Sequence, residues 1–299
     1  MTEPLITVSN SALELELSPS IGGAISNFNW LGGGPPSPIL RGSNTPLENV
    51  LDAACFPLVP FVNRIRGGCF SFRGRSVRLS PNMAGDPSPL HGQGWMSAWR
   101  VESSSDAKAV LAFEHRAGEW PWSYEARQHF RVDANALELT LQCRNTSVEP
   151  MPCGLGFHPY FRCGAATRIE TEVSDVWTVD DKVLPVARMP ATGRYSVADD
   201  PACGRGLDNG YSDWSGRAVF SDPGWPFEIA LSSPQARFFQ IYSPAAGGLF
   251  VAEPVTHANA ALNEPEEDWP MLGIHVLEPG EEMALDARLE VLPKRSSLG

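Results

Sequence analysis

The chain has 299 residues, with 23 Lys or Arg against 35 Asp or Glu, and its formal net charge is −12. Hydrophobic residues make up 42% of it and charged residues 19%, which is ample material for a packed core and excludes intrinsic disorder. Because the chain is acidic and has no basic run, it lacks the clustered Lys and Arg that nucleic acids and anionic membranes attract, so we expect neither as a partner.

Alternation of apolar and polar residues begins near the N-terminus, where glutamates separate Leu13, Leu15 and Leu17. The same period of two recurs from Leu137 to Arg144 and from Leu285 to Val291. Successive strand residues point to opposite faces, so each pattern predicts a half-buried antiparallel strand with one face on a core.

Turn signals punctuate these strands, and no long helical period with a cap at its head is found. The clearest turns are Arg73-Gly74 between Phe70–Phe72 and Val77–Leu79, Asp133-Ala134-Asn135 after Phe130–Val132, and Pro279-Gly280 before the last strand. The pattern favours an all-β protein with many short strands. Since no linker divides the chain, we expect one domain over residues 1–299, a single large antiparallel β-sandwich, with residues 180–210 as a long turn-rich excursion.

Six cysteines lie far apart and form no C-x-x-C pair: Cys55, Cys69, Cys143, Cys153, Cys163 and Cys203. The N-terminus lacks the positively charged and apolar regions of a secretory signal, and no apolar run approaches the roughly 18 residues of a transmembrane helix. We therefore expect a cytoplasmic protein whose cysteines are reduced core thiols, in preference to a disulfide framework or a zinc site.

Motifs for several common chemistries are absent from the sequence. It contains no G-x-S-x-G elbow, no phosphate-binding P-loop and no dinucleotide-binding glycine pattern. The six histidines never form H-x-H or H-E-x-x-H, and we expect neither a metal nor a cofactor. What remains is a set of His, Glu, Asp and Arg residues among aromatics and glycines, a setting that suits acid–base work on a polar, ring-shaped ligand.

The first candidate contacts are Arg64, in the run Asn63-Arg64-Ile65, and His91, in Leu90-His91-Gly92. Arg64 offers a planar fork of donors to ligand hydroxyls, and His91 precedes a glycine where backbone can approach closely. Taken singly, each is equally well explained as a surface arginine and a turn histidine.

His158 lies in Gly156-Phe157-His158-Pro159-Tyr160-Phe161, where the proline restricts its backbone. An imidazole held in this way is a natural general acid, although an isolated case is more often a packed core histidine. Glu253 ends the apolar run Leu249–Ala252, a position where loss of solvent raises a carboxylate pKa toward that of a working base. The alternative is an ordinary strand end before Pro254.

Asp208 and Gln240 are weaker candidates, since Asp beside Asn-Gly is usually a turn former and an alternating Gln usually faces solvent. Trp95, Trp99 and Trp225 are candidates for stacking on a sugar ring, and each is equally well explained as core.

The order of these motifs carries more information than any one of them. The succession N-R-I-x-G-G-x-F-x-F-x-G, L-H-G, G-x-H-P-Y-F, L-D-x-x-Y, Q-x-Y, E-P…A-x-N and L-x-P-G-E, from about Leu51 to Val291, resembles the aldose 1-epimerase (galactose mutarotase-like) family. The resemblance implies a large antiparallel β-sandwich that interconverts the α and β anomers of a free sugar without a cofactor. Carried over position by position, it implies that Glu253 is the general base, that His158 is the general acid, and that Arg64, His91, Asp208 and Gln240 contact sugar hydroxyls.

Departures from the family pattern leave the sugar open. Phe56–Val62 stands where a Gly-rich approach is more usual, Pro254–His257 follows the glutamate, and Asn209 replaces a common His. The substrate is then a neutral aldose or an anionic, phosphorylated or sulfonated sugar, with Arg66, Arg73 and Arg75 as candidate anion contacts.

Two other functions remain possible from the sequence. One is a non-catalytic carbohydrate-binding or regulatory protein on the same fold. The other is a carbohydrate-processing hydrolase or isomerase on a related sandwich. A glycosidase would need two suitably spaced carboxylates, Glu253 and, as the second, Asp208. In each case we expect a small-molecule sugar as the partner and a monomer or homodimer.

Overall fold

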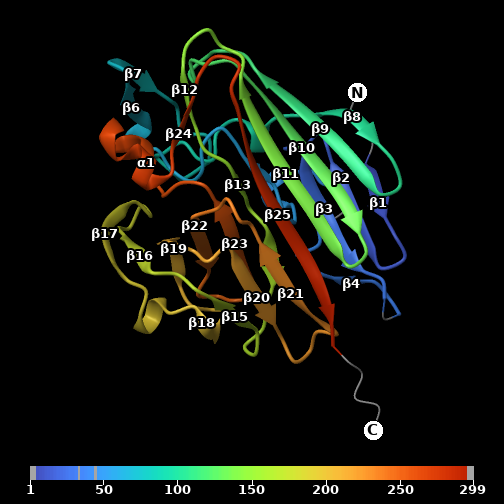
Figure 1. Cartoon of the computed structure of the whole chain (residues 1–299). Coiled ribbons are helices and arrows are strands. Elements are labelled where there is room, and N and C mark those ends of the chain that lie inside the picture. The colour runs from blue at the N-terminus through green and yellow to red at the C-terminus, as the bar shows by residue number, and fades with distance from the viewer. Residues whose placement is uncertain (1–4, 33, 44–45, 295–299) are drawn as a thin grey trace.

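The computed structural model describes residues 5–32, 34–43 and 46–294, and is built almost entirely from antiparallel strands (Figure 1). Its largest sheet has nine strands in the order β18-β15-β20-β21-β25-β11-β10-β9-β8. Their bounds are β8 (Arg100–Ser104), β9 (Lys108–His115), β10 (Tyr124–Asp133), β11 (Ala136–Asn145), β15 (Arg168–Thr171), β18 (Ala198–Pro201), β20 (Arg217–Ser221), β21 (Phe227–Ser232) and β25 (Glu282–Pro293).

An eight-stranded sheet lies against it and holds the centre of the molecule. Its order is β17-β16-β19-β22-β23-β13-β5, and β14 also pairs with β23. The bounds are β5 (Pro57–Leu58), β13 (Gly156–Phe157), β14 (Tyr160–Arg162), β16 (Asp175–Val179), β17 (Pro185–Pro190), β19 (Leu207–Ser212), β22 (Phe238–Ser243) and β23 (Leu249–Val255).

Smaller sheets complete the sandwich. The four-stranded one comprises β1 (Ile6–Ser9), β2 (Leu13–Ser18), β3 (Ala24–Trp30) and β4 (Ser37–Pro38), and it lies beside β9, β10 and β11 in Figure 1. The hairpins are β6 (Cys69–Phe72) with β7 (Arg75–Arg78), and β12 (Met151–Cys153) with β24 (His275–Leu277).

Helical turns are short and few in the described part of the chain. The α-helix is α1 (Trp269–Leu272), and the 3₁₀ turns are η1 (Val50–Asp52), η2 (Arg66–Gly68), η3 (Gly94–Met96), η4 (Gly193–Tyr195), η5 (Ala261–Asn263) and η6 (Glu266–Asp268). Among the described residues there is no helix of the length and apolarity that crossing a membrane requires.

The core fills the space between the sheets as the alternation predicts. Leu13, Leu15 and Leu17 of β2 are fully buried, and so are alternate residues of β11 and β25. Phe161 of β14 packs on Phe220 of β20 and on Phe250 of β23, with ring centroids 4.7 and 5.0 Å apart, which joins the two large sheets. The strands, the hairpin turns and the antiparallel sandwich predicted from the sequence are therefore confirmed.

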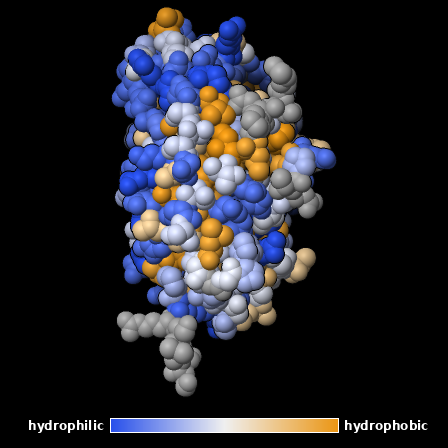
Figure 2. Space-filling model, turned by 90° about the vertical axis from the view of Figure 1, so that its right-hand side faces the viewer, coloured by the Kyte–Doolittle hydropathy of each residue, from blue (hydrophilic) through white to orange (hydrophobic). Residues whose placement is uncertain are grey.

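The outer surface of the sandwich is mixed in character. Figure 2 shows the face on the right-hand side of Figure 1, where hydrophobic side chains gather along the middle and hydrophilic ones cover much of the left margin. Large apolar residues that remain exposed, such as Met96, Val148, Val186 and Met271, belong to separate elements. Scattered exposure of this kind is usual for a folded protein.

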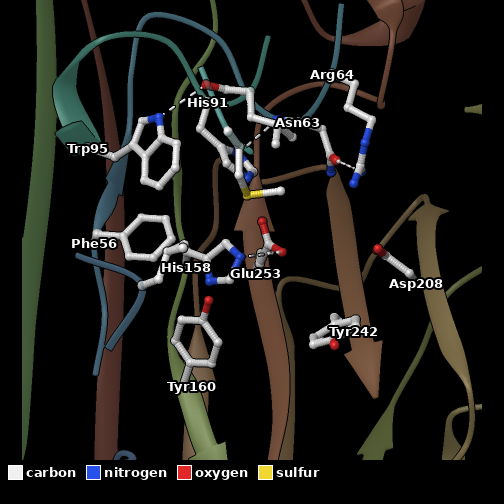
Figure 3. A pocket seen from close by; sticks show the side chains of 13 residues that line it. Phe56, Asn63, Arg64, His91, Trp95, His158, Tyr160, Asp208, Tyr242 and Glu253 are labelled. Atoms are coloured by element: carbon white, nitrogen blue, oxygen red, sulfur yellow. Dashed lines mark hydrogen bonds and ion pairs between the residues drawn. The ribbon is translucent and has the colours of Figure 1, made fainter. Parts of the chain in front are cut away.

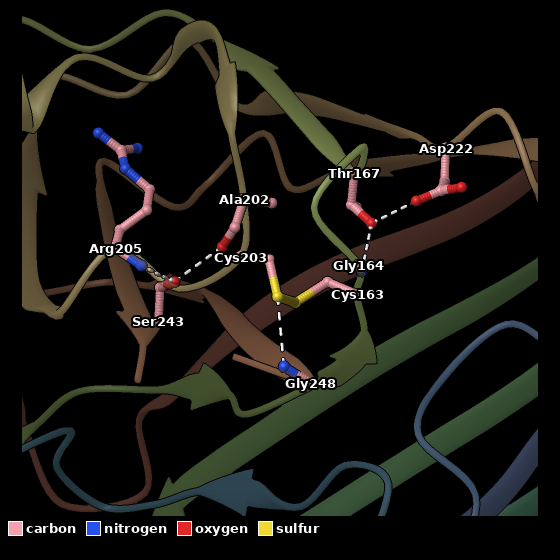
Figure 4. Close-up of a disulfide and its surroundings, with 9 residues drawn as sticks. All are labelled: Cys163, Gly164, Thr167, Ala202, Cys203, Arg205, Asp222, Ser243 and Gly248. Carbon is pink, nitrogen blue, oxygen red and sulfur yellow. Dashed lines mark hydrogen bonds between the residues drawn. A yellow bond between two sulfur atoms is a disulfide. The ribbon is translucent and has the colours of Figure 1, made fainter. Parts of the chain in front are cut away.

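Two expectations need correction. The segment 180–210 is more regular than a loop, since it contains β17, η4, β18 and the start of β19. Two of the six cysteines are also not free thiols, because Cys163 and Cys203 form a disulfide across 40 residues (Figure 4). Sequence spacing could not reveal this pair, because the two cysteines are brought together only when β14 and the turn before β19 meet. Cys55, Cys69, Cys143 and Cys153 are free, as expected.

Candidate active site

A cavity of about 150 Å³ opens over one face of the eight-stranded sheet (Figure 3). The strand register places Asp208 opposite Tyr242 and Gln240 opposite Glu253, so β19, β22 and β23 present these four side chains on the same face. The lining residues are Leu51, Phe56, Asn63, Arg64, Met83, Leu90, His91, Trp95, His158, Tyr160, Asp208, Tyr242 and Glu253. Five of the six predicted site residues therefore line one cavity, although the chain separates them widely.

Glu253 and His158 face each other across the floor of the cavity. His158 Nε2 lies 3.4 Å from Glu253 Oε1, and the two residues are only 9% and 2% exposed. Neither His158 Nδ1 nor Glu253 Oε2 has a hydrogen-bond partner among the described residues. Buried polar atoms are normally satisfied, so two such atoms on residues that contact each other make this pair a candidate for contact with a polar ligand.

Burial controls the protonation of this pair. Loss of solvent raises the pKa of Glu253 well above its usual value, and the charge of Asp208 raises it further, while Arg64 opposes the rise. Burial also lowers the pKa of His158 to about 3, and the Arg41 guanidinium adds to that effect. Both shifts favour the uncharged forms, a neutral Glu253 carboxyl and a neutral His158 imidazole.

Stacked rings fix the orientation of His158. Its imidazole lies against Phe56 with centroids 4.4 Å apart and against Tyr160 with centroids 4.7 Å apart. The guanidinium of Arg41 covers the Tyr160 ring at 3.8 Å, and the backbone N–H of His158 donates to Phe56 O. Trp95 stacks on Phe56 beyond it. Side chains packed on both sides leave the imidazole little freedom to rotate.

His91 is held in one tautomer. Its Nδ1 accepts a hydrogen bond from the backbone N–H of Asn63 at 3.1 Å, so the proton of the neutral ring lies on Nε2. Burial, followed by the charges of His158 and Arg64, keeps the pKa of His91 well below its usual value. The neutral His91 ring therefore has its N–H available for donation at Nε2.

Arg64 forms part of the opposite wall. Its Nε donates to Asp86 Oδ2 at 2.9 Å, and Nη1 donates to Asn63 Oδ1 at 3.2 Å. The loop after β23 holds the backbone of this arginine, because Asn259 Oδ1 accepts from Arg64 N and Ala260 N donates to Arg64 O. Residues that follow the E-P motif, Asn259 and Ala260, therefore hold the backbone of the N-R-I motif in place.

His257 extends this support. Its Nδ1–H donates to Ala258 O at 2.8 Å, which leaves Nε2 to accept from the backbone N–H of Val62 at 3.0 Å. Burial lowers the pKa of His257 to about 4, so the ring is neutral and joins the end of β23 to the segment that leads into Arg64. His257, singled out as a departure from the family pattern, is therefore a buried structural residue.

Asp208 and Gln240 act together. Gln240 Nε2 donates to Asp208 Oδ1 at 2.7 Å, and Gln240 does not line the cavity itself. Burial raises the pKa of Asp208, while Arg64 and the Gln240 amide oppose the rise. Gln240 therefore orients a carboxylate that faces the cavity.

Two lining residues were not indicated by the sequence, and several sequence candidates lie outside the cavity. Leu51 and Met83 line the cavity and carried no sequence signal, because an isolated Leu or Met in a loop resembles any other. Trp95 lies in the wall, whereas Trp99 is core and Trp225 packs against Phe227. The three arginines considered as anion contacts bind protein groups outside the cavity: Arg66 on Pro185 O, Arg73 on Glu278 and Arg75 on Glu149.

Comparisons with known proteins agree with this architecture. The chain is 32% identical to the Escherichia coli K12 protein YphB, described as uncharacterized, over 96% of this chain and 98% of that protein. A solved Escherichia coli K12 structure, described as a "Putative aldose 1-epimerase", superposes with a TM-score of 0.86 at 31% identity, covering 97% of this chain and 99% of that one. A galactose mutarotase-like protein from Clostridium acetobutylicum superposes with a TM-score of 0.83 at 19% identity, covering 97% and 95%, and this shows the fold alone.

The family comparison covers nearly the whole sequence. The model of the Aldose 1-epimerase family matches residues 4–290, which include all six predicted site residues. The resemblance inferred from the motif succession is thereby confirmed, and the chain belongs to the aldose 1-epimerase family.

Proposed function

We propose that this protein is a mutarotase that interconverts the α and β anomers of a free, neutral aldose by opening and reclosing the sugar ring. The observation that carries the proposal is the buried Glu253–His158 pair, whose Nε2 and Oε1 atoms are 3.4 Å apart at the floor of a cavity lined with hydrogen-bonding groups. Ring opening needs one base for the C1 hydroxyl and one acid for the ring oxygen, and this pair supplies both.

The reactive form is carboxylate Glu253 with imidazolium His158. It arises when the proton of the pair moves from the Glu253 carboxyl to His158 Nε2, a transfer that sugar hydroxyls donating to Glu253 would favour. Glu253 then takes the proton of the C1 hydroxyl, and His158 delivers its proton to the ring oxygen as the C1–O5 bond breaks. After rotation about C1–C2 both transfers run in reverse and the ring closes as the other anomer, so the number of protons is conserved.

The remaining polar residues bind hydroxyls. His91 Nε2–H and the Nη hydrogens of Arg64 that Asn63 does not take donate, whereas Asp208, oriented by Gln240, accepts. Phe56, Trp95 and Tyr160 supply apolar surface for the C–H faces of a pyranose. A neutral sugar suits this wall, because Arg64 is the one Lys or Arg among the described lining residues and it is already paired with Asp86.

The test is the rate of anomer exchange for galactose, glucose and xylose, followed by polarimetry or by NMR exchange spectroscopy. We expect acceleration of at least one of these sugars, and a loss of about 10²–10⁴-fold in Glu253→Gln and in His158→Asn. If both variants keep the wild-type rate, the acid–base assignment is wrong. If sugars bind without acceleration, the protein is a carbohydrate-binding member of the family.

A further inference from the structure

Asp86 lies behind the cavity wall and is bound to Arg64, the one arginine among the described residues of that wall. Its Oδ2 accepts from Arg64 Nε at 2.9 Å, and the two side chains are 9% and 10% exposed. Its other oxygen, Oδ1, accepts from the backbone N–H of Ser88 at 2.9 Å. Asp86 does not line the cavity, so its effect on a ligand passes through Arg64.

The loop that carries Asp86 is anchored at both ends. Ser80 donates through its backbone N–H and its hydroxyl to the two carboxylate oxygens of Glu119. Asn82 binds both the N–H and the carbonyl of Leu90, two residues after Ser88. Met83, between these anchors, lines the cavity. A carboxylate on so constrained a loop holds its partner in one place.

We propose that Asp86 is the positioning residue for Arg64 and that it makes the cavity select neutral sugars over anionic ones. This inference rests on the proposed function and adds to it a determinant of substrate charge. Arginine binds oxyanions most tightly through two parallel N–H groups, and Asp86 already occupies Nε, which is one of them. The other edge, Nη1 with Nη2, is also partly engaged, because Nη1 donates to Asn63 Oδ1 at 3.2 Å. The Nη hydrogens that remain suit single hydrogen bonds to hydroxyls.

The charged groups around Arg64 also favour neutral sugars over anionic ones. Asp208 and Glu253 both face it across the cavity and influence one another, as the raised pKa of Glu253 indicates. Arg41, which does not line the cavity, donates to the carbonyls of Leu51 and Ala53 and covers the Tyr160 ring. A phosphorylated or sulfonated sugar would therefore meet the Asp208 carboxyl, while Arg64, the one Lys or Arg among the described lining residues, is already paired with Asp86.

The experiment compares Asp86→Asn with Asp86→Glu, using an aldose that the wild-type enzyme accelerates and the 6-phosphate of that same aldose. Asp86→Asn keeps the shape and removes the charge, so Arg64 gains a free Nε edge. A hydrogen bond to a charged group is worth about 1.5–3 kcal/mol, so we expect KM for the neutral sugar to rise roughly 10–100-fold with kcat little changed. The ratio of kcat/KM for the phosphate to that for the neutral sugar should rise at least about 10-fold. Asp86→Glu keeps the charge, so that ratio should remain near the wild-type value.

Asp222→Asn is the matched control. Asp222 accepts from the N–H of Gly224 in the same type of turn and from the Thr167 hydroxyl, and it does not line the cavity. This variant removes the same charge and should leave KM and the selectivity ratio unchanged.

Several results would overturn the inference. An Asp86→Asn enzyme with wild-type KM and an unchanged ratio rules out the role of Asp86, and so does an Asp86→Glu enzyme whose ratio rises. If Asp86→Asn fails to fold, Asp86→Ser replaces it, and the same rise in KM and in the selectivity ratio is expected. Calorimetric titration with both sugars measures the same selectivity in binding. An enzyme that accelerates no sugar therefore refutes the proposed function while still reporting on Asp86.

Discussion

The disulfide between Cys163 and Cys203 makes a quantitative prediction possible. It joins the end of β14 to the turn before β19, and Cys203 Sγ also accepts from the N–H of Gly248, just before β23 (Figure 4). Each of these three points in the chain lies five residues from a residue that lines the cavity. Cys163 follows His158, Cys203 precedes Asp208, and Gly248 precedes Glu253. We therefore expect the bond to stabilise the part of the sandwich that carries the site.

The magnitude follows from the length of the closed loop. A separation of 40 residues removes about 13 cal/mol/K of entropy from the unfolded chain, or about 4 kcal/mol at 25 °C. Replacing both cysteines with serine should lower the free energy of unfolding by about that amount. For a urea slope near 3 kcal/mol/M, the midpoint should fall by about 1.3 M.

The assay is urea unfolding followed by fluorescence, with and without a reductant. Reductant should shift the wild type to the midpoint of the double variant and leave the variant unchanged. Cys69→Ser, which removes a free thiol, serves as the control and should respond to reductant as the wild type does. A wild-type midpoint that reductant does not move would refute the reasoning.

Three further predictions concern the cavity and its support. Because the proposed mechanism passes a proton between Glu253 and His158, the two groups act as a unit, and their double variant should lose about as much kcat as either single variant. Multiplicative losses in anomer exchange would contradict this. His257 titrates near pH 4 when folded and near 6.5 when unfolded, so its neutral folded form adds stability above pH 6.5 that is lost as the pH falls toward 4. Between pH 7 and pH 5 the free energy of unfolding should fall by about 2 kcal/mol from this source. Denaturant titrations at the two pH values should show a fall that is smaller by that amount in His257→Gln than in the wild type. Gly92→Ala places a Cβ 2.1 Å from Val59 O at a φ of +72°, so it should destabilise the fold by more than about 3 kcal/mol in thermal unfolding. A variant with wild-type stability would contradict that clash.

The sequence determined the class of fold because its strands are amphipathic. The alternation at Leu13, Leu15 and Leu17 predicts a strand with one buried face, and the turn at Arg73-Gly74 predicts a hairpin. Both patterns are visible in the sequence because they depend only on neighbouring residues. The motif succession also determined the family and the residues to examine. These include Glu253, where a carboxylate follows an apolar run and proves to be buried.

The tertiary structure decided what those residues do to one another. Only the register of β19, β22 and β23 shows that Gln240 orients Asp208 from outside the cavity. Likewise, only the packing of distant loops brings Asp86 to Arg64 and Cys163 to Cys203. The physical reason is that periodicity records which face of a strand is buried, whereas partners across a sandwich depend on how strands far apart in the chain are aligned.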